Sequence, residues 1–347
     1  MDALSYQRAA SIDAAIAAAQ QPGAAFIGGG TNLLDLMKGG IAHPLKLIDI
    51  TRIAALDSIE TLPDGGLRIG ALVRNSDAAN HALVRTRYPL LTQALLAGAS
   101  PQLRNMATVG GNLMQRTRCA YFYDTAFAQC NKRAPGSGCA ARVGFNRMHA
   151  ILGASAQCVA VNPSDMSVAL AALDATVQVR GPRGARAIPL AQFHRLPGER
   201  ADLDTTLAPG ELITSVDLPP PAFSDHTHYL KLRDRASYAF ALVSVAVALQ
   251  LDGHRVRAAR IALGGVAHKP WRASRAEQHL TGRTLDAATL RTAAAAELAQ
   301  AQPLSGNAFK VELAQRAMVR AAMLAAGSQV SGMGGMSDAS GGTGELA

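Results

Sequence analysis

The chain has 347 residues, of which 49% are hydrophobic and only 4% aromatic, and its formal net charge is +9 at pH 7. This composition excludes a disordered chain, and the length suits two or three domains with sizeable cores. The charge alone is compatible with nucleic-acid binding, but the combination of aromatic and basic residues typical of such proteins is missing. A basic surface that faces an acidic protein partner or an anionic cofactor is therefore favoured.

The N-terminus carries no charged stretch followed by an apolar one, so the sequence predicts no signal peptide. No uninterrupted apolar run is long enough to cross a membrane. We therefore expect a chain that folds in the cytoplasm, where thiols stay reduced.

The first part of the chain alternates between short strands and helices. We expect a helix over 10–20, a strand that ends in a glycine turn at 28–30, strands over 46–51 and 66–73, a helix over 81–100 that closes on Gly98, and a second glycine turn within 108–113.

After the cysteine-bearing segment, residues 164–175 predict a helix with Ser164 as its N-cap. A β-hairpin over 176–190 and a strand over 211–221 follow, and three prolines at the end of that strand indicate a domain boundary.

Residues 221–326 predict a compact α+β unit, with a long apolar strand, a hairpin turn at Asp252–Gly253, a second strand and two helices. The tail over 327–347 is rich in Gly, Ser and Met and is expected to be disordered.

Two glycine-rich segments have the composition of phosphate-binding turns. In FIGGGTNLL, three glycines follow a strand, and bare N–H groups in such a turn can form a site for an anion. No Gly-Lys-Ser/Thr follows, and the GxGxxG spacing fails at Leu33, so neither a P-loop nor a dinucleotide fingerprint is present. One such turn is equally compatible with no ligand, but the second segment, TVGGN at 108–112, favours a two-sided pyrophosphate clamp.

The four cysteines all lie between residues 119 and 158, at positions Cys119, Cys130, Cys139 and Cys158. No CxxC pair occurs, so a zinc ribbon or thioredoxin motif is poorly supported. The spacing leaves three interpretations open: a [4Fe–4S] cluster, two disulfides, or buried free thiols. The last applies above all to Cys158, which lies in an apolar context.

The loop chemistry between the cysteines suits a cluster. Pro135, Gly136 and Gly138 allow sharp turns that offer N–H groups to sulfur. The basic residues that we expect to offset the negative charge of a cluster are Arg118, Lys132 and Arg133.

Several segments together resemble the flavin subunit of the molybdenum hydroxylases, the xanthine dehydrogenase family. These are FIGGGTNLLDLMK, IGALVR, LLAGASPQLRNMATVGGNL and NPSDM, and the resemblance extends over roughly residues 1–325. RCAYFYDT and CNKRAPGSGC further resemble markers of the cluster-bearing FAD subunit of three-subunit bacterial aldehyde oxidoreductases.

The resemblance implies an α+β fold. It implies a two-part FAD-binding domain over 1–220, similar to vanillyl-alcohol oxidase, with subdomains 1–57 and 58–220 and an iron–sulfur segment at 115–160. A C-terminal α+β domain of the CO dehydrogenase flavoprotein type is implied over 221–326.

The resemblance also implies the residues that bind each cofactor. For FAD these are Phe26, Ile27, Gly28, Gly29, Gly30, Thr31, Asn32, Leu33 and Leu34 in the first segment, Thr108, Gly110, Gly111 and Asn112 in the second, and Asp165 and Lys231 elsewhere. A solvated strand lysine stays an alternative for Lys231. For a [4Fe–4S] cluster the implied ligands are Cys119, Cys130, Cys139 and Cys158.

The function implied by the resemblance is electron transfer. A molybdopterin-binding large subunit would oxidise an aldehyde, a small subunit with [2Fe–2S] clusters would pass the electrons on, and FAD on this chain would deliver them to an external acceptor. No catalytic residue is implied on this chain, and Tyr238 and Phe240 are expected either to face the flavin or to lie in a strand core.

The alternative functions are a stand-alone FAD oxidoreductase and a non-catalytic nucleotide-binding subunit. The complex would lie in the cytoplasm, or in the periplasm by co-export with a partner that bears a signal.

Overall fold

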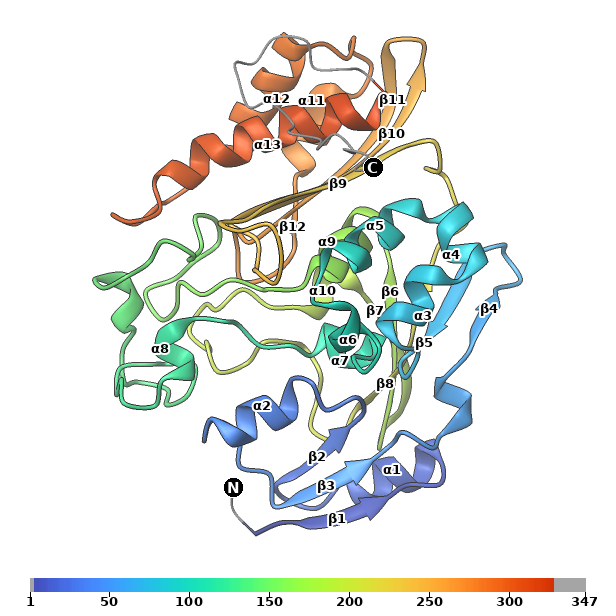
Figure 1. Cartoon of the computed structure of the whole chain (residues 1–347), viewed down its shortest axis with the longest axis vertical. Coiled ribbons are helices and arrows are strands. Elements are labelled where there is room, and N and C mark those ends of the chain that lie inside the picture. The colour runs from blue at the N-terminus through green and yellow to red at the C-terminus, as the bar shows by residue number, and fades with distance from the viewer. Residues whose placement is uncertain (1–2, 328–347) are drawn as a thin grey trace, which may run out of the picture.

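Three sheets organise residues 3–327, which the computed structural model of the chain describes (Figure 1). The first sheet is parallel, in the order β1-β3-β2, and buries Ile48 against Ile16 and Leu56. Its elements are β1 (Ser5–Arg8), α1 (Ile12–Ala18), β2 (Ala24–Ile27), α2 (Leu33–Lys38), β3 (Lys46–Asp49) and η1 (Ala54–Leu56). The β2–α2 connection carries the three glycines, so the first glycine segment lies where a strand ends and a helix begins.

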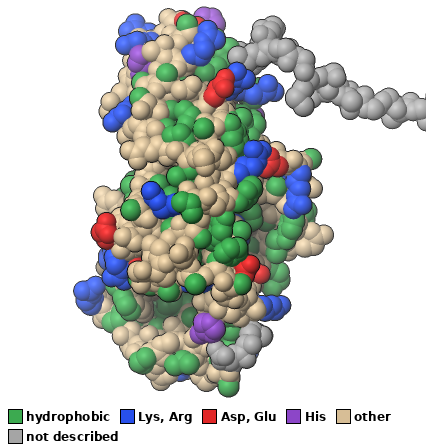
Figure 2. Space-filling view, turned by 90° about the vertical axis from the view of Figure 1, so that its left-hand side faces the viewer, with side chains coloured by type: hydrophobic (Ala, Val, Ile, Leu, Met, Phe, Trp, Pro, Cys, Tyr) green, Lys and Arg blue, Asp and Glu red, His purple; other side chains and the backbone are tan. Residues whose placement is uncertain are grey.

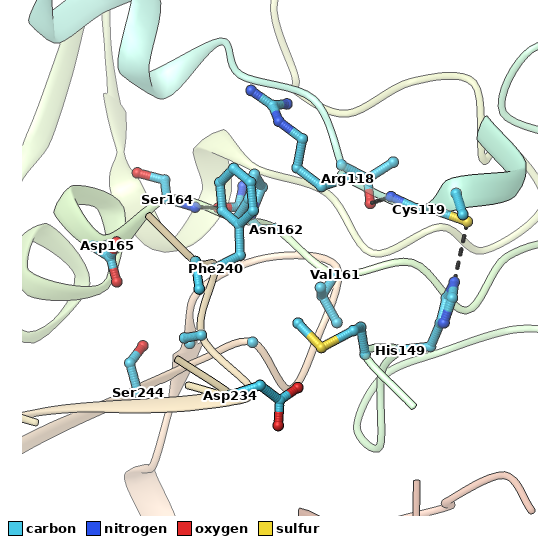
Figure 3. A pocket seen from close by; sticks show the side chains of 18 of the residues that line it. Arg118, Cys119, His149, Val161, Asn162, Ser164, Asp165, Asp234, Phe240 and Ser244 are labelled. Atoms are coloured by element: carbon cyan, nitrogen blue, oxygen red, sulfur yellow. Dashed lines mark hydrogen bonds between the residues drawn. The ribbon is translucent and has the colours of Figure 1, made fainter. Parts of the chain in front are cut away.

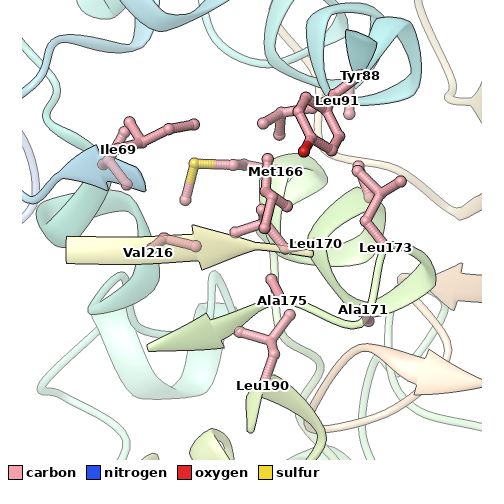
Figure 4. Close-up of a cluster of buried hydrophobic side chains, with 14 of the residues drawn as sticks. Ile69, Tyr88, Leu91, Met166, Leu170, Ala171, Leu173, Ala175, Leu190 and Val216 are labelled. Atoms are coloured by element: carbon pink, nitrogen blue, oxygen red, sulfur yellow. The ribbon is translucent and has the colours of Figure 1, made fainter. Parts of the chain in front are cut away.

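The second sheet is antiparallel and five-stranded, in the order β4-β5-β8-β6-β7. Its strands are β4 (Ile59–Thr61), β5 (Leu67–Gly70), β6 (Thr176–Gly181), β7 (Gly184–Pro189) and β8 (Leu212–Leu218). Ile69 and Val216 of this sheet face Met166, Leu170 and Leu91 in one apolar core (Figure 4). The helices that accompany the sheet are α3 (Asn75–Asn80), α4 (Ala82–Arg87), α5 (Pro89–Ala97), α6 (Pro101–Arg104), α7 (Val109–Leu113), α9 (Asp165–Ala172) and α10 (Leu190–Phe193).

The third sheet is antiparallel, in the order β12-β11-β10-β9, and both of its faces are covered. Along β10, Val245 and Val247 enter the core beneath the C-terminal helices, whereas Ala246 and Ala248 enter the core shared with α9. Burial on both faces explains why this strand is apolar at nearly every position. The elements are β9 (His226–Leu232), β10 (Val243–Asp252), β11 (Arg255–Gly264), β12 (Trp271–Arg272), α11 (Ser274–Leu280), α12 (Ala287–Leu298) and α13 (Phe309–Ala325).

The cysteine-bearing segment is mostly irregular. Between α7 and α9 the described helices are α8 (Ala120–Tyr123) and the short η2 (Ala140–Arg142), and an isolated bridge pairs Cys130 with Cys139. Figure 2 views the molecule from the side on which this segment lies in Figure 1, and hydrophobic side chains form patches on that face. Val143 and Phe145 of this segment are 92% and 66% exposed.

The strands and helices of the sequence analysis recur with three corrections. The helix expected over 81–100 is two helices, because Tyr88 leaves the helical conformation and Pro89 starts α5 at its first position. TVGGN is not an open turn: it forms α7, in which the Thr108 hydroxyl accepts a hydrogen bond from the N–H of Gly111. The C-terminal unit, as far as the structure describes it, has three helices instead of the expected two, because α11 precedes the predicted pair.

The limits of the domains stay a prediction. The tail expected to be disordered, 327–347, lies outside the described residues except for Gly327.

His194 fixes the position of α7. Its ring Nε2 lies 2.9 Å from the carbonyl oxygen of Leu113, the last residue of that helix, and His194 is only 3% exposed. Burial lowers the pKa of His194 to about 4, against the smaller effect of the bond to Leu113. The imidazole is therefore neutral at pH 7, and its Nε2–H donates to Leu113.

The buried, neutral His194 makes the stability of the protein dependent on pH. Between about pH 6.5 and pH 4 the unfolded chain binds a proton on this residue that the folded chain does not bind, so stability falls as pH falls through this window. His194→Gln keeps a donor toward Leu113 without titrating. From pH 6.5 to pH 4 we expect its free energy of unfolding to fall by up to about 3 kcal/mol less than that of the wild type. Denaturant unfolding of both proteins across this pH range measures the difference, and equal losses would contradict it.

Candidate functional site

A large cavity of about 590 Å³ lies where the two glycine segments, the start of α9 and the loop after β9 meet. Its size is in the range of cofactor pockets. Five of the residues predicted to bind FAD line it: Thr31, Asn32, Asn112, Asp165 and Lys231. We call it the large cavity.

The two glycine segments touch each other at one wall of the large cavity. A Cβ atom at Gly29 would lie 1.8 Å from the carbonyl oxygen of Met106, so no side chain fits there. The Asn32 side chain donates to the carbonyl of Gly111 at 3.2 Å. Segments almost eighty residues apart are thus held together by one close backbone approach and one hydrogen bond.

The first glycine segment has N–H groups to offer to an anion. No backbone hydrogen bond between described residues is donated by the N–H groups of residues 28–32, and Gly30 has a φ of +73°. In the second segment the N–H groups of Val109, Gly110 and Gly111 bind Val73, Ala71 and Thr108. The donors suited to a diphosphate therefore come mainly from the first segment.

Asp165 anchors the opposite wall of the large cavity. It is the first residue of α9, and its carboxylate accepts from the Tyr229 hydroxyl at 2.6 Å and from Lys231 Nζ at 2.8 Å. The Lys231 and Asp165 side chains are 6% and 8% exposed, so the alternative of a solvated strand lysine is wrong. Burial, and then the charge of Asp165, raises the pKa of Tyr229 well above its usual value.

The other residues predicted for FAD are not among those that line the cavity. Phe26 and Ile27 end β2, Gly28 lies beside Thr108, Leu33 and Leu34 start α2, and Gly110 is packed against Ala71. They shape the two glycine segments without lining the cavity.

Sequence reasoning did not assign Arg118 to this cavity. Its guanidinium donates to Asn32 Oδ1 at 2.7 Å and lies 5.2 Å from the centre of the Phe240 ring. Tyr238 and Phe240, 62% and 41% exposed, lie in the loop after β9 and line the cavity, so the strand-core alternative is wrong for both. No local pattern identifies Arg118, because its partners lie far away in the sequence.

The four cysteines line a second, very small pocket of about 10 Å³, which we call the thiol pocket. All four are free thiols, and Cys130 and Cys158 are buried. Among the described residues, no three His, Cys, Asp or Glu side chains form a group that could hold a single metal ion. A four-iron cluster does not need several ligands around one metal ion, because each thiolate binds its own iron atom.

Backbone N–H groups and neighbouring thiols set the protonation of the thiol pocket. A hydrogen bond from Cys158 lowers the pKa of Cys139, helped by the N–H groups of Val159, Ala141 and Arg142 against burial. The same bond, together with burial, raises the pKa of Cys158. Burial raises the pKa of Cys119 to about 11. Thiols that accept several N–H bonds are suited to act as thiolate ligands.

Positive charge exceeds negative charge beside the thiol pocket. Lys132, 3% exposed, donates to Asp204 and to the carbonyl of Ala201, and Arg116 binds the same carboxylate at 2.6 Å. Burial, followed by repulsion from Lys132, lowers the pKa of His268 to about 3, so this neighbour is neutral. Two cations thus share one anion, which suits an anionic group in the pocket.

Arg133 does not line the thiol pocket, although the sequence indicated that it would offset the charge of a cluster. Its guanidinium donates to the carbonyls of Tyr121, Phe122 and Asp124 and thereby fixes the loop around α8. The guanidinium groups of Arg133 and Arg118 thus bind other partners, and neither residue lines the thiol pocket. Of the three basic residues expected beside a cluster, Lys132 lines this pocket.

A third cavity of about 200 Å³, which we call the connecting cavity and which Figure 3 shows by itself, shares lining residues with the other two. It shares Arg118, Asp165 and Phe240 with the large cavity and Cys119 with the thiol pocket. The three cavities therefore form one continuous region of the protein.

A cradle of free N–H groups, a cavity of cofactor size and a fixed buried ion pair define a protein that binds a phosphate-bearing cofactor. Residues 2–221 match the family described as FAD binding domain in molybdopterin dehydrogenase, and residues 228–325 match the CO dehydrogenase flavoprotein C-terminal domain. The chain belongs to this family of FAD-binding subunits of molybdenum hydroxylases.

Individual relatives agree with this assignment. The chain is 54% identical over 321 residues, 92% of its length and 96% of the relative's, to the aldehyde oxidoreductase FAD-binding subunit PaoB of Escherichia coli. It is 28% identical to the glyceraldehyde dehydrogenase medium chain of Sulfolobus acidocaldarius, over 81% of this chain and 82% of that one. In a structure of CO dehydrogenase from Oligotropha carboxidovorans, a chain matches with a TM-score of 0.75 and 25% identity, over 94% of this chain and 99% of that one.

These findings confirm the predicted fold and the main functional prediction. The chain is an oxidoreductase subunit that binds FAD and serves electron transfer. In the described part of the chain, no helix has the length and apolar character needed to span a membrane.

The close approach at Gly29 predicts a sharp effect of adding one methyl group. In Gly29→Ala the Cβ atom would overlap the Met106 carbonyl, and the two glycine segments would have to separate. We expect the affinity for FAD to fall at least about tenfold, which corresponds to about 1.4 kcal/mol in binding, so that the purified variant holds less FAD than the wild type. Flavin absorbance per chain measures this.

Gly39→Ala is the matched control, because the nearest atom to its Cβ would be the Asp35 carbonyl oxygen at 3.4 Å. It should bind FAD as the wild type does. Full FAD content in Gly29→Ala would show that contact between the segments is not required.

Proposed function

We propose that this chain binds FAD in the large cavity and a [4Fe–4S] cluster in the thiol pocket, as the electron-transfer subunit of a molybdenum-dependent aldehyde oxidoreductase. Electrons from iron–sulfur clusters of a partner subunit would leave through FAD to an external acceptor. The observation that carries the proposal is that all four cysteines of the chain line one pocket beside a cavity of cofactor size.

The free N–H groups of residues 28–32 are the proposed contacts of the FAD diphosphate. Asn32, held by Arg118 and by Gly111, keeps the first segment in place. Bound FAD would supply redox chemistry that no amino-acid side chain provides. The protein's part is to bind the cofactor, to orient it and to place fixed charges around it.

The Asp165–Lys231 pair is the proposed polar contact of the flavin ring. Both side chains line the large cavity, and Tyr229 and the Ala97 carbonyl fix their orientation. Two of the three N–H donors of Lys231 bind Asp165 and the Ala97 carbonyl, so one donor stays available to the ring and the pair needs no rearrangement when the ring binds.

Four features support a cluster on this chain. The thiols come from four separate points of the segment, all are free, N–H groups point at their sulfur atoms, and buried positive charge lies next to them. A cluster with four thiolates is anionic, so the excess charge of Lys132 and Arg116 would stabilise it.

Support for partners comes from the relatives and from the surface. The relative that is 54% identical is named as a subunit of an aldehyde oxidoreductase, and the CO dehydrogenase chains are named medium chains. The exposed Val143 and Phe145 on the cysteine-bearing segment suit burial against another subunit. We propose a heterotrimer with a molybdopterin-binding large subunit and a [2Fe–2S] small subunit, in the cytoplasm or co-exported to the periplasm with a signal-bearing partner.

Removal of one thiol tests the cluster. Protein purified without oxygen should contain FAD and about four iron and four sulfide per chain. Cys130→Ser should lose most of the iron and sulfide but keep FAD, because Cys130 does not line the large cavity. Metal analysis and the visible spectrum measure both cofactors.

Val143→Ser is the control, since it alters an exposed side chain of the same segment. It should retain both cofactors. A folded wild-type protein with FAD but no iron would remove the cluster from the proposal, and a folded protein with neither would remove both cofactors.

A further inference from the structure

His149 contacts one of the four cysteines from outside the thiol pocket. Its ring Nε2 lies 3.1 Å from the sulfur of Cys119, the bond that Figure 3 marks with a dashed line. The residue is 5% exposed and lines the connecting cavity together with Cys119. The ring therefore stands between the thiol pocket and the region that borders the large cavity.

The direction of this bond follows from the sulfur atom, because the ring's other nitrogen does not fix the tautomer. Nδ1 of His149 is buried and has no hydrogen-bond partner among the described residues. A neutral imidazole carries one N–H, and a thiolate can only accept. A thiolate at Cys119 therefore requires the proton on Nε2, with the histidine as donor.

The first turn of α13 and the residues before it hold the backbone of His149 in place. Its carbonyl accepts from Lys310 Nζ at 2.8 Å and from Asn307 Nδ2 at 3.1 Å. Both donors are 0% exposed. The His149 N–H in turn donates to the carbonyl of Asn146 at 3.0 Å. These bonds join residues about 160 positions apart, so the C-terminal sheet and helices determine where the ring lies.

We infer that His149 is a positioning residue, which donates a hydrogen bond to Cys119 and thereby raises the reduction potential of the cluster proposed above. This inference rests on the proposed cluster. An N–H group that donates to a thiolate stabilises the additional negative charge of the reduced cluster, and hydrogen bonds to sulfur are among the factors that set such potentials. Lys310 and Asn307 act through His149, since both bind its carbonyl.

A purely structural role for His149 predicts something different. If the ring only fills space, a side chain of similar size without a donor leaves the potential unchanged. If the donor matters, an amide that reaches the same sulfur restores the potential. His149→Leu and His149→Gln separate these two roles.

The experiment is a potentiometric titration of anaerobically purified protein, with the reduced cluster followed by electron paramagnetic resonance and with iron and FAD measured per chain. In His149→Leu the cluster should titrate at a lower potential than in the wild type, and in His149→Gln it should return toward the wild-type value. FAD content should be the same in all proteins. His228→Gln is the control, because it alters a half-buried histidine of β9 that lines none of the three cavities, and it should not shift the potential.

An unchanged potential in His149→Leu with full iron would overturn the inference. If His149→Leu holds no iron, His149→Gln decides: an intact cluster with a potential near that of the wild type supports a donor role, and loss of iron there as well overturns it. Absence of iron from the wild-type protein itself would instead refute the proposed cluster.

Discussion

The close approach of Gly29 to the carbonyl oxygen of Met106 is the contact on which the rest of the site depends. It brings the β2–α2 connection of the first sheet against the chain that leads into α7. Once these segments touch, Asn32 can bind Gly111, and Arg118 can bind Asn32. The wall of the large cavity is thus built by backbone contact between residues from two different sheets and their connections. This is also why a single added carbon atom at position 29 has consequences well beyond its own volume.

Two buried charge networks flank the region and differ in their balance. Asp165 and Lys231 form a matched pair, further satisfied by Tyr229, and the pair carries no net charge. Lys132 and Arg116 share the single carboxylate of Asp204 and leave an excess of positive charge beside the thiols. A buried ion pair is retained at a cost in desolvation. The Asp165–Lys231 pair is suited to orient a neutral ring. The network around Asp204 is suited to hold an anionic group, which would balance its excess positive charge.

The parts of the structure that the sequence predicted are those with a local signal. The glycines, the N-cap at Ser164 and the hairpins are read from adjacent residues, and α9 and the β6–β7 hairpin recur as expected. TVGGN was predicted as a turn but is helical, because tertiary bonds to Val73 and Ala71 and the Thr108 cap select the helix. Arg118 and His149 contact residues that are far away in the sequence. No spacing rule predicts such contacts. Lys231 was assigned only through a family resemblance, and its burial became evident from the fold.

The presence of FAD and a four-iron cluster on one chain, in two cavities that the connecting cavity joins, is tested most directly by diffraction from anaerobically grown crystals at the iron absorption edge. We predict a single strong anomalous peak enclosed by the sulfur atoms of Cys119, Cys130, Cys139 and Cys158, with flavin density in the large cavity and the diphosphate against residues 28–32. Flavin density without an anomalous peak, or with a disulfide between Cys139 and Cys158, would contradict it.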